Sequence, residues 1–121
     1  MESILIVDDD VNLCTMLLEE LTEVGYETYF LTNGDGVLEY IRNNQVDLLL
    51  LDLNMPRMNG FEVLKELQIN DIDVRVIVLT AYADVKSAME SAKMGASDFI
   101  SKPYDFDELL ITIRRTVQRE V

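Results

Sequence analysis

The chain has 121 residues, of which 49% are hydrophobic, and it carries a formal net charge of −13 at pH 7. Its length and apolar content predict a single domain over residues 1–121 with a packed core, and its negative charge would repel a phosphate backbone, so we expect no direct binding of nucleic acid. Because the sequence contains no histidine and only one cysteine, Ser-His-Asp and Cys-His catalysis, His-containing zinc sites and a disulfide framework are excluded.

Three strands are predicted in the first half of the chain. Residues 4–7 form a short apolar run, and the helix that follows has apolar residues at 11, 14, 17, 18 and 21 and a stop at Gly25. Residues 26–31 are more polar and alternate loosely, as an edge strand does, and a short helix is expected from 37 to about 43. Four leucines at 48–51 predict a strand buried on both faces, which is typical of the middle of a parallel sheet.

Two further strands are predicted in the second half. Asn59 and Gly60 mark a turn, and apolar residues at 61, 64 and 67 predict a helix after it. The run 74–79 predicts a strand that ends at Thr80. A helix expected at 84–94 has a weak apolar face, so we expect it to be held loosely. A short strand at 97–101 and a helix from 106 to 117 complete the pattern.

Alternating strands and helices predict an α/β fold with a doubly wound, five-stranded parallel sheet in the flavodoxin-like order 2-1-3-4-5, with helices on both faces. In this order the strands at 4–7 and 48–51 are neighbours. Asp8 and Asp9 follow the first of them, and Asp52 follows the second. Because parallel strands end at the same edge of a sheet, we expect these three carboxylates to converge there.

Carboxylates that converge need a counter-charge. Two unit charges about 4 Å apart repel by roughly 4 kcal/mol at an effective dielectric near 20, and a hard dication such as Mg²⁺, with Mn²⁺ as the alternative, cancels this repulsion. Thr80 and Lys102 end the neighbouring strands and offer a hydroxyl and an ammonium group to an anion. Since carboxylates can accept phosphoryl groups, this pattern predicts phosphoryl transfer onto Asp52.

Six short motifs stand in a fixed order along the chain: Val7-Asp8-Asp9, Leu51-Asp52-Leu53-Asn54-Met55-Pro56, Asn59-Gly60, Leu79-Thr80-Ala81, Gly95-Ala96 and Lys102-Pro103. With them the sequence resembles the receiver domain of response regulators in bacterial two-component and phosphorelay systems. The resemblance extends over nearly the whole chain, from residue 4 to about residue 117.

This resemblance implies a metal and phosphoryl site. Asp52 would be the phosphoacceptor. Asp9 would bind Mg²⁺ directly and Asp8 mainly through water, while the backbone carbonyl of Asn54 would be a further ligand.

The resemblance also implies roles around the incoming group. Thr80 and Lys102 would hold phosphoryl oxygens, and Phe99 would be the switch aromatic that turns inward when Thr80 moves. The peptide bond between Lys102 and Pro103 would be cis. Tyr82 would modulate the access of water to the phosphoryl group.

The implied partners follow from this chemistry. Because the sequence has no histidine, the donor must be another protein or domain, and the resemblance implies a sensor histidine kinase or a histidine phosphotransfer protein. The chain would also catalyse its own slow dephosphorylation without being a conventional enzyme. Its output would be a downstream effector domain or protein. A homodimer, if one forms, is expected through the face made by 84–94, 97–101 and 106–117. We expect a cytoplasmic protein without a membrane span, because the single cysteine favours a reduced setting and no signal peptide or long apolar run is recognisable.

Three alternatives remain at the level of sequence. A haloacid-dehalogenase-type aspartyl-phosphate phosphatase would carry a second acid where this chain has Asn54. A flavin or nucleotide carrier on the same fold would need a phosphate loop where Asp8 and Asp9 stand, and these would repel the phosphate. A degenerate receiver would serve only as a protein-binding module.

Overall fold

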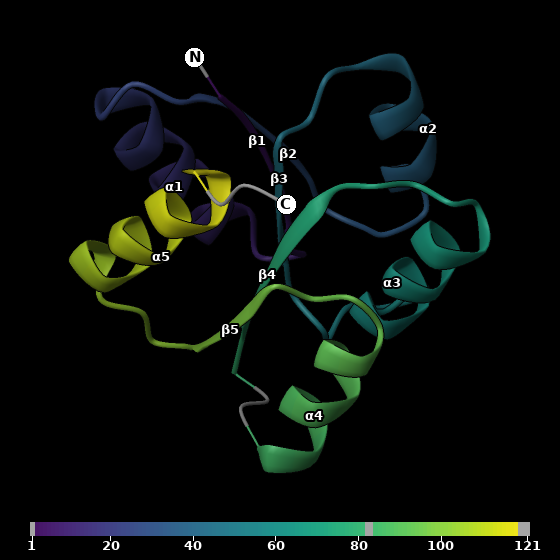
Figure 1. The fold of residues 1–121 in the computed structure, drawn as a ribbon. Helices are drawn as coiled ribbons and strands as arrows, with labels where there is room; N and C mark the ends of the chain where they lie inside the picture. The colour runs from purple at the N-terminus through teal and green to yellow at the C-terminus, as the bar shows by residue number, and fades with distance from the viewer. Residues whose placement is uncertain (1, 82–83, 119–121) are drawn as a thin grey trace.

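A computed structural model describes residues 2–81 and 84–118, which form a five-stranded sheet with helices on both faces (Figure 1). In chain order the elements are β1 (Ser3–Val7), α1 (Val11–Glu23), β2 (Glu27–Leu31), α2 (Val37–Asn43), β3 (Leu48–Leu51), α3 (Gly60–Ile69), β4 (Arg75–Thr80), α4 (Val85–Lys93), β5 (Asp98–Ser101) and α5 (Phe106–Gln118). The strands are parallel in the order β2-β1-β3-β4-β5, which confirms the predicted doubly wound α/β fold. No helix within the described ranges is long and apolar enough to cross a membrane.

Two hydrophobic cores lie on opposite faces of the sheet, because successive side chains of a strand point to opposite sides. α1 and α5 cover one face, where Leu17 and Ile113 belong to the same cluster as Leu50 (Figure 1). α2 and α3 cover the other face, where Leu64 belongs to the cluster that contains Leu49. All four leucines of β3 are therefore buried, as the continuous apolar run predicts.

Three residues separate the end of β1 from the start of α1. The Asp10 side chain accepts a hydrogen bond from the Leu13 N–H at 3.1 Å and caps the helix. In the first turn Val11 is 54% exposed, so it does not belong to the apolar face that the sequence pattern suggested. The buried face of α1 begins at Cys14 and continues through Leu17 and Leu21.

α4 lies next to α3, on the same side of the sheet (Figure 1). Asp84 caps it, because its side chain accepts a hydrogen bond from the Ser87 N–H. In the described part of the chain, Ser91 is the one residue of α4 that is buried, whereas Val85 and Met89 are 75% and 56% exposed. The helix thus has the weak apolar face that its sequence predicts.

Candidate functional site

The carboxyl ends of β1 and β3 bring two buried aspartates together. Val7 and Leu51 are paired in register, and Asp8 and Asp52 are the residues that follow them. The Asp52 N–H donates to the Val7 carbonyl oxygen at 2.9 Å, which continues the ladder one residue beyond β3. Asp8 and Asp52 are only 3% and 5% exposed. The strand order alone therefore produces a pair of carboxylates that water reaches poorly.

Asp9 completes a group of three carboxylates. One oxygen each from Asp8, Asp9 and Asp52 lies within 4.8 Å of the others, and Asp9 is the exposed member. Like charges at such a distance repel by about 3.5 kcal/mol if the effective dielectric is near 20. Hard divalent cations prefer carboxylate oxygens, and Mg²⁺ in particular keeps several waters beside one or two carboxylates. The donor set fits a metal ion of this kind, with Asp9 on the side open to solvent.

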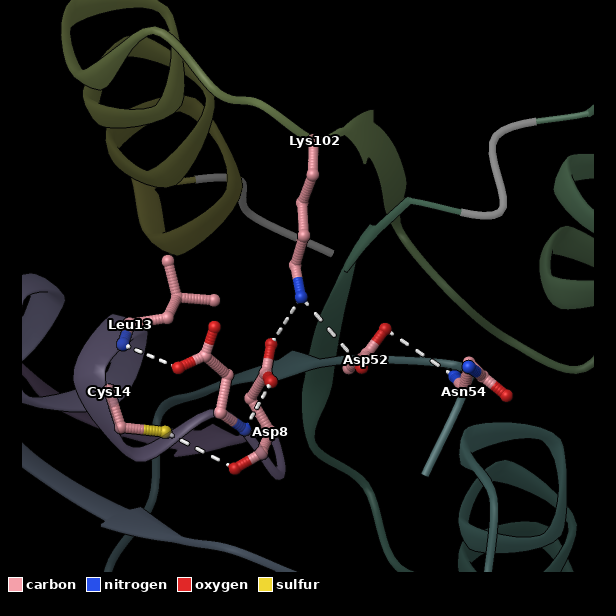
Figure 2. Close-up of polar contacts among 7 residues, drawn as sticks. Asp8, Leu13, Cys14, Asp52, Asn54 and Lys102 are labelled. Carbon is pink, nitrogen blue, oxygen red and sulfur yellow. Dashed lines mark hydrogen bonds and ion pairs between the residues drawn. The ribbon is translucent and has the colours of Figure 1, made fainter. Parts of the chain in front are cut away.

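Lys102 supplies positive charge at the same edge. It follows the last residue of β5, and its backbone N–H donates to the Thr80 carbonyl oxygen at 2.9 Å. Its Nζ lies 2.6 Å from Asp8 Oδ2 and 3.7 Å from Asp52 Oδ2, so the side chain extends from β5 across β4 to the ends of β1 and β3 (Figure 2). The Lys102–Pro103 peptide bond is cis. One ammonium group thus contacts two of the three carboxylates.

The surroundings raise the pKa of the Asp52 carboxyl above its ordinary value. Burial is the largest cause, and the neighbouring Asp8 carboxylate acts in the same direction. The Lys102 ammonium, a hydrogen bond from the Thr80 side chain and one from the Asn54 N–H at 3.4 Å oppose the rise. The negative charge of Asp52 is therefore incompletely compensated, and a cation or a reaction that consumes this charge is favoured.

The backbone around Asp8 is held from α1. The Cys14 thiol donates to the Asp8 carbonyl oxygen at 3.3 Å, and the Asp10 N–H donates to Asp8 Oδ1 at 2.9 Å (Figure 2). Burial and the nearby carboxylates raise the pKa of Cys14 to about 12, so the thiol stays protonated and remains a donor. Sequence reasoning assigned Cys14 to core packing, which is correct for its burial but misses this contact.

Gly60 forms the wall behind Asp52. It is the first residue of α3, and its N–H donates to the Leu53 carbonyl oxygen at 3.0 Å. A Cβ on Gly60 would collide with the Asp52 carbonyl oxygen and lie 2.7 Å from Leu53 Cα. A reciprocal capping box between Asn59 and Glu62 fixes the helix start at this point. The sequence indicated only a turn here, because the close approach depends on tertiary packing.

The other candidate residues lie around the cluster. Thr80, the last residue of β4, is fully buried, and Asn54 is exposed beside Asp52. Phe99 lies on β5, three residues before Lys102, and packs against the core on the α2 and α3 side of the sheet. Tyr82 lies outside the residues that the structure describes.

The family match, the similar sequences and the similar structures agree with one another. A family model of the response regulator receiver domain matches residues 4–114. Transcriptional regulatory protein ZraR of Klebsiella oxytoca is 42% identical over 110 residues, covering 91% of this chain but only 25% of that protein. Sporulation initiation phosphotransferase F of Bacillus subtilis is 37% identical over 114 residues, covering 94% of this chain and 92% of that protein. The structure of response regulator TrrA from Thermotoga maritima, solved with Mg²⁺-BeF, has a TM-score of 0.85 at 36% identity and covers 96% of this chain and 99% of that one.

Proposed function

This chain belongs to the response regulator receiver domain family, and we propose that Asp52 is the residue on which it accepts the phosphoryl group. The family match does not favour the dehalogenase-type phosphatase. One observation carries the choice of residue: Asp52 is the carboxylate that meets both the Lys102 ammonium, at 3.7 Å, and the Thr80 side chain, at the edge of the sheet where the other two carboxylates gather. An anion on Asp52 would meet that ammonium directly.

The roles of the neighbours follow from their charges. Asp8, Asp9 and Asp52, together with the backbone carbonyl of Asn54, would hold Mg²⁺, or Mn²⁺ in its place. Bound there, the ion neutralises charge on the phosphoryl oxygens, which is the main requirement of phosphoryl transfer. Lys102 would turn from Asp8 toward the phosphoryl group.

The donor lies on another protein or domain, because these 121 residues contain no histidine. In the proposed step an Asp52 oxygen forms the new P–O bond while the P–N bond of a phosphohistidine breaks, and the imidazole nitrogen keeps the electron pair and takes up a proton. A sensor histidine kinase or a histidine phosphotransfer protein would supply that group in the cytoplasm. Water would later hydrolyse the acyl phosphate slowly, with Asn54 and Tyr82 tuning its access.

The output would run through the face formed by α4, β5 and α5. Thr80 would follow the new charge on Asp52, and Phe99 would turn inward from β5. The chain spans about a quarter of the length of ZraR and nearly all of phosphotransferase F. This receiver could therefore act on an effector domain in the same protein or on a separate effector protein. A homodimer through this face would be one mode of output.

The proposal is tested with acetyl phosphate and Mg²⁺, followed by intact mass measurement. We expect one added phosphoryl group that hydroxylamine removes, because acyl phosphates are labile to this nucleophile. Asp52→Ala should abolish the addition, whereas Asp35→Ala, at an exposed carboxylate paired with Arg57, should leave it unchanged. Phosphorylation that persists in Asp52→Ala would contradict the assignment. A wild-type chain that is never modified would favour the degenerate receiver, and rapid turnover of a generic phosphate ester would favour the phosphatase.

A further inference from the structure

The segment that carries Lys102 is attached to the β1–α1 unit at two points. Lys102 Nζ lies 2.6 Å from Asp8 Oδ2, and the Tyr104 hydroxyl donates to Glu20 Oε1 at 2.8 Å. These contacts join residues that are 94 and 84 positions apart in the sequence. The two attachments lie on either side of Pro103, so the short segment between them is fixed at both ends.

α1 connects the two attachment points rigidly. Glu20 lies on this helix, whose buried residues pack into the core, and ten residues before it Asp10 caps the start of the helix. That start is itself joined to Asp8, through the Asp10 N–H and through the Cys14 thiol. A hydrogen bond from Tyr104 to Glu20 therefore fixes the Lys102 segment relative to the acidic cluster, because both are held by the same helix.

The ring and the hydroxyl of Tyr104 have separate roles. The ring packs against the core between α1 and α5 and lines a groove of about 440 Å³ with Leu13, Met16 and Phe106. The hydroxyl is the polar end of this side chain and contacts Glu20. Burial and that hydrogen bond raise the pKa of Tyr104, which keeps the phenol protonated as a donor. Replacement by phenylalanine thus removes the tether and keeps the packing.

We propose that Tyr104 and Glu20 are positioning residues that keep Lys102 within reach of Asp52 for phosphoryl transfer. Lysine has a flexible four-carbon stem, and the site of its ammonium group depends on where its backbone is anchored. Positioning of charged groups is a main contribution of proteins to phosphoryl transfer. This inference rests on the proposed function, since it requires that Asp52 is the phosphoacceptor.

The test compares Tyr104→Phe, Glu20→Ala and Glu20→Gln with a matched control, Tyr29→Phe. Tyr29 donates to Glu27 at 2.9 Å on the exposed surface of β2, so this control removes a similar tyrosine–glutamate bond away from the site. Two quantities are measured for each variant. One is the rate of phosphorylation by acetyl phosphate at fixed Mg²⁺. The other is the rate at which an amine-reactive ester acylates Lys102, relative to Lys65 on α3.

We expect Tyr104→Phe and Glu20→Ala each to slow phosphorylation by about 3- to 10-fold, the range that loss of one typical intramolecular hydrogen bond allows. The acylation of Lys102 should rise by a similar factor while that of Lys65 is unchanged. Glu20→Gln keeps an acceptor oxygen and should stay within about twofold of wild type. The double variant should be no slower than either single variant, because both remove one interaction.

Three results would overturn the inference. One is an unchanged acylation rate of Lys102 in Tyr104→Phe, and another is a parallel rise at Lys65, which would mean general loosening of the fold. The third is a phosphorylation rate in Tyr104→Phe equal to that of Tyr29→Phe. A wild-type chain that is not phosphorylated on Asp52 contradicts the proposed function and the inference together, whereas normal phosphorylation of wild type and of Tyr104→Phe contradicts the inference alone.

Discussion

Replacement of Asp52 by asparagine is expected to stabilise the fold while it removes the phosphoacceptor. The Asp52 carboxylate is buried within 4.8 Å of two other carboxylates. Each repulsion amounts to about 3.5 kcal/mol at an effective dielectric near 20, and solvent at the exposed Asp9 weakens one of them. The attraction between the Asp52 carboxylate and the Lys102 ammonium at 3.7 Å offsets about 4.5 kcal/mol of this repulsion at the same dielectric. Burial of the charge adds a further penalty, so the balance is unfavourable, as the raised pKa of Asp52 indicates.

We expect Asp52→Asn to increase the free energy of unfolding by about 1–3 kcal/mol at pH 7 in the presence of a chelator, or to raise Tm by about 4 °C or more in a domain of this size. The measurement is thermal unfolding followed by circular dichroism, with Asp35→Asn as the control at an exposed carboxylate. That control should shift stability by no more than about 0.5 kcal/mol.

The pH dependence of stability gives an independent check on the sign of the Asp52→Asn effect. The folded state binds the proton of Asp52 more tightly than the unfolded state, because its pKa is raised on folding. The penalty is therefore absent below the ordinary pKa of aspartate, grows as the pH rises toward the folded pKa, and is complete above it. The advantage of Asp52→Asn should shrink on acidification, and added Mg²⁺ should reduce it at pH 7 by stabilising wild type. A variant whose Tm equals or falls below that of wild type at pH 7 without metal would refute this reasoning.

Three further predictions concern the surroundings of the site. Gly60→Ala should lower the free energy of unfolding, measured in urea, by about 2–4 kcal/mol, since the added Cβ meets backbone atoms of Asp52 and the next residue. In the control Gly36→Ala, the atom nearest to the added Cβ is 3.9 Å away, so the change should stay within about 1 kcal/mol. Equal losses in the two variants would exclude the steric explanation. Cys14 is fully buried and its pKa is raised to about 12, so iodoacetamide at pH 8 should modify it only after denaturant is added; rapid modification of the native protein would contradict this. Backbone amides of α4 should exchange hydrogen faster than those of α3, and Asp84→Ala should accelerate them about fivefold by removing the cap, whereas a slowly exchanging α4 would show that it is held more firmly than its burial suggests.

The strands follow from local sequence pattern, and their order follows from the topological rules for alternating strands and helices. A strand covered on both sides must be apolar throughout, so the four leucines of β3 identify it without any tertiary information. Once the order is known, the ends of β1 and β3 place Asp8 beside Asp52. The helix cap at Asp10 is equally local, since donor and acceptor are three residues apart.

Features that join distant side chains could not be predicted in the same way. The ammonium of Lys102 lies closer to Asp8 than to Asp52, because the reach and rotamer of a flexible side chain decide this. The hydrogen bond between Tyr104 and Glu20 depends on how α1 and the segment after β5 are packed together. Gly60 appeared to be an ordinary turn residue, because the carbonyl that excludes a side chain belongs to a different part of the chain.

The slight burial of α4 also bears on how the protein behaves in concentrated solution. When a helix that covers apolar surface moves, it exposes that surface to solvent. Each such movement then carries a risk of aggregation. Among the described residues of α4, the only one that is buried is a serine, so displacement of this helix uncovers little hydrocarbon from its own side. The net charge of −13 adds repulsion between copies of this chain, so a movement of α4 would add little to the risk of non-specific aggregation.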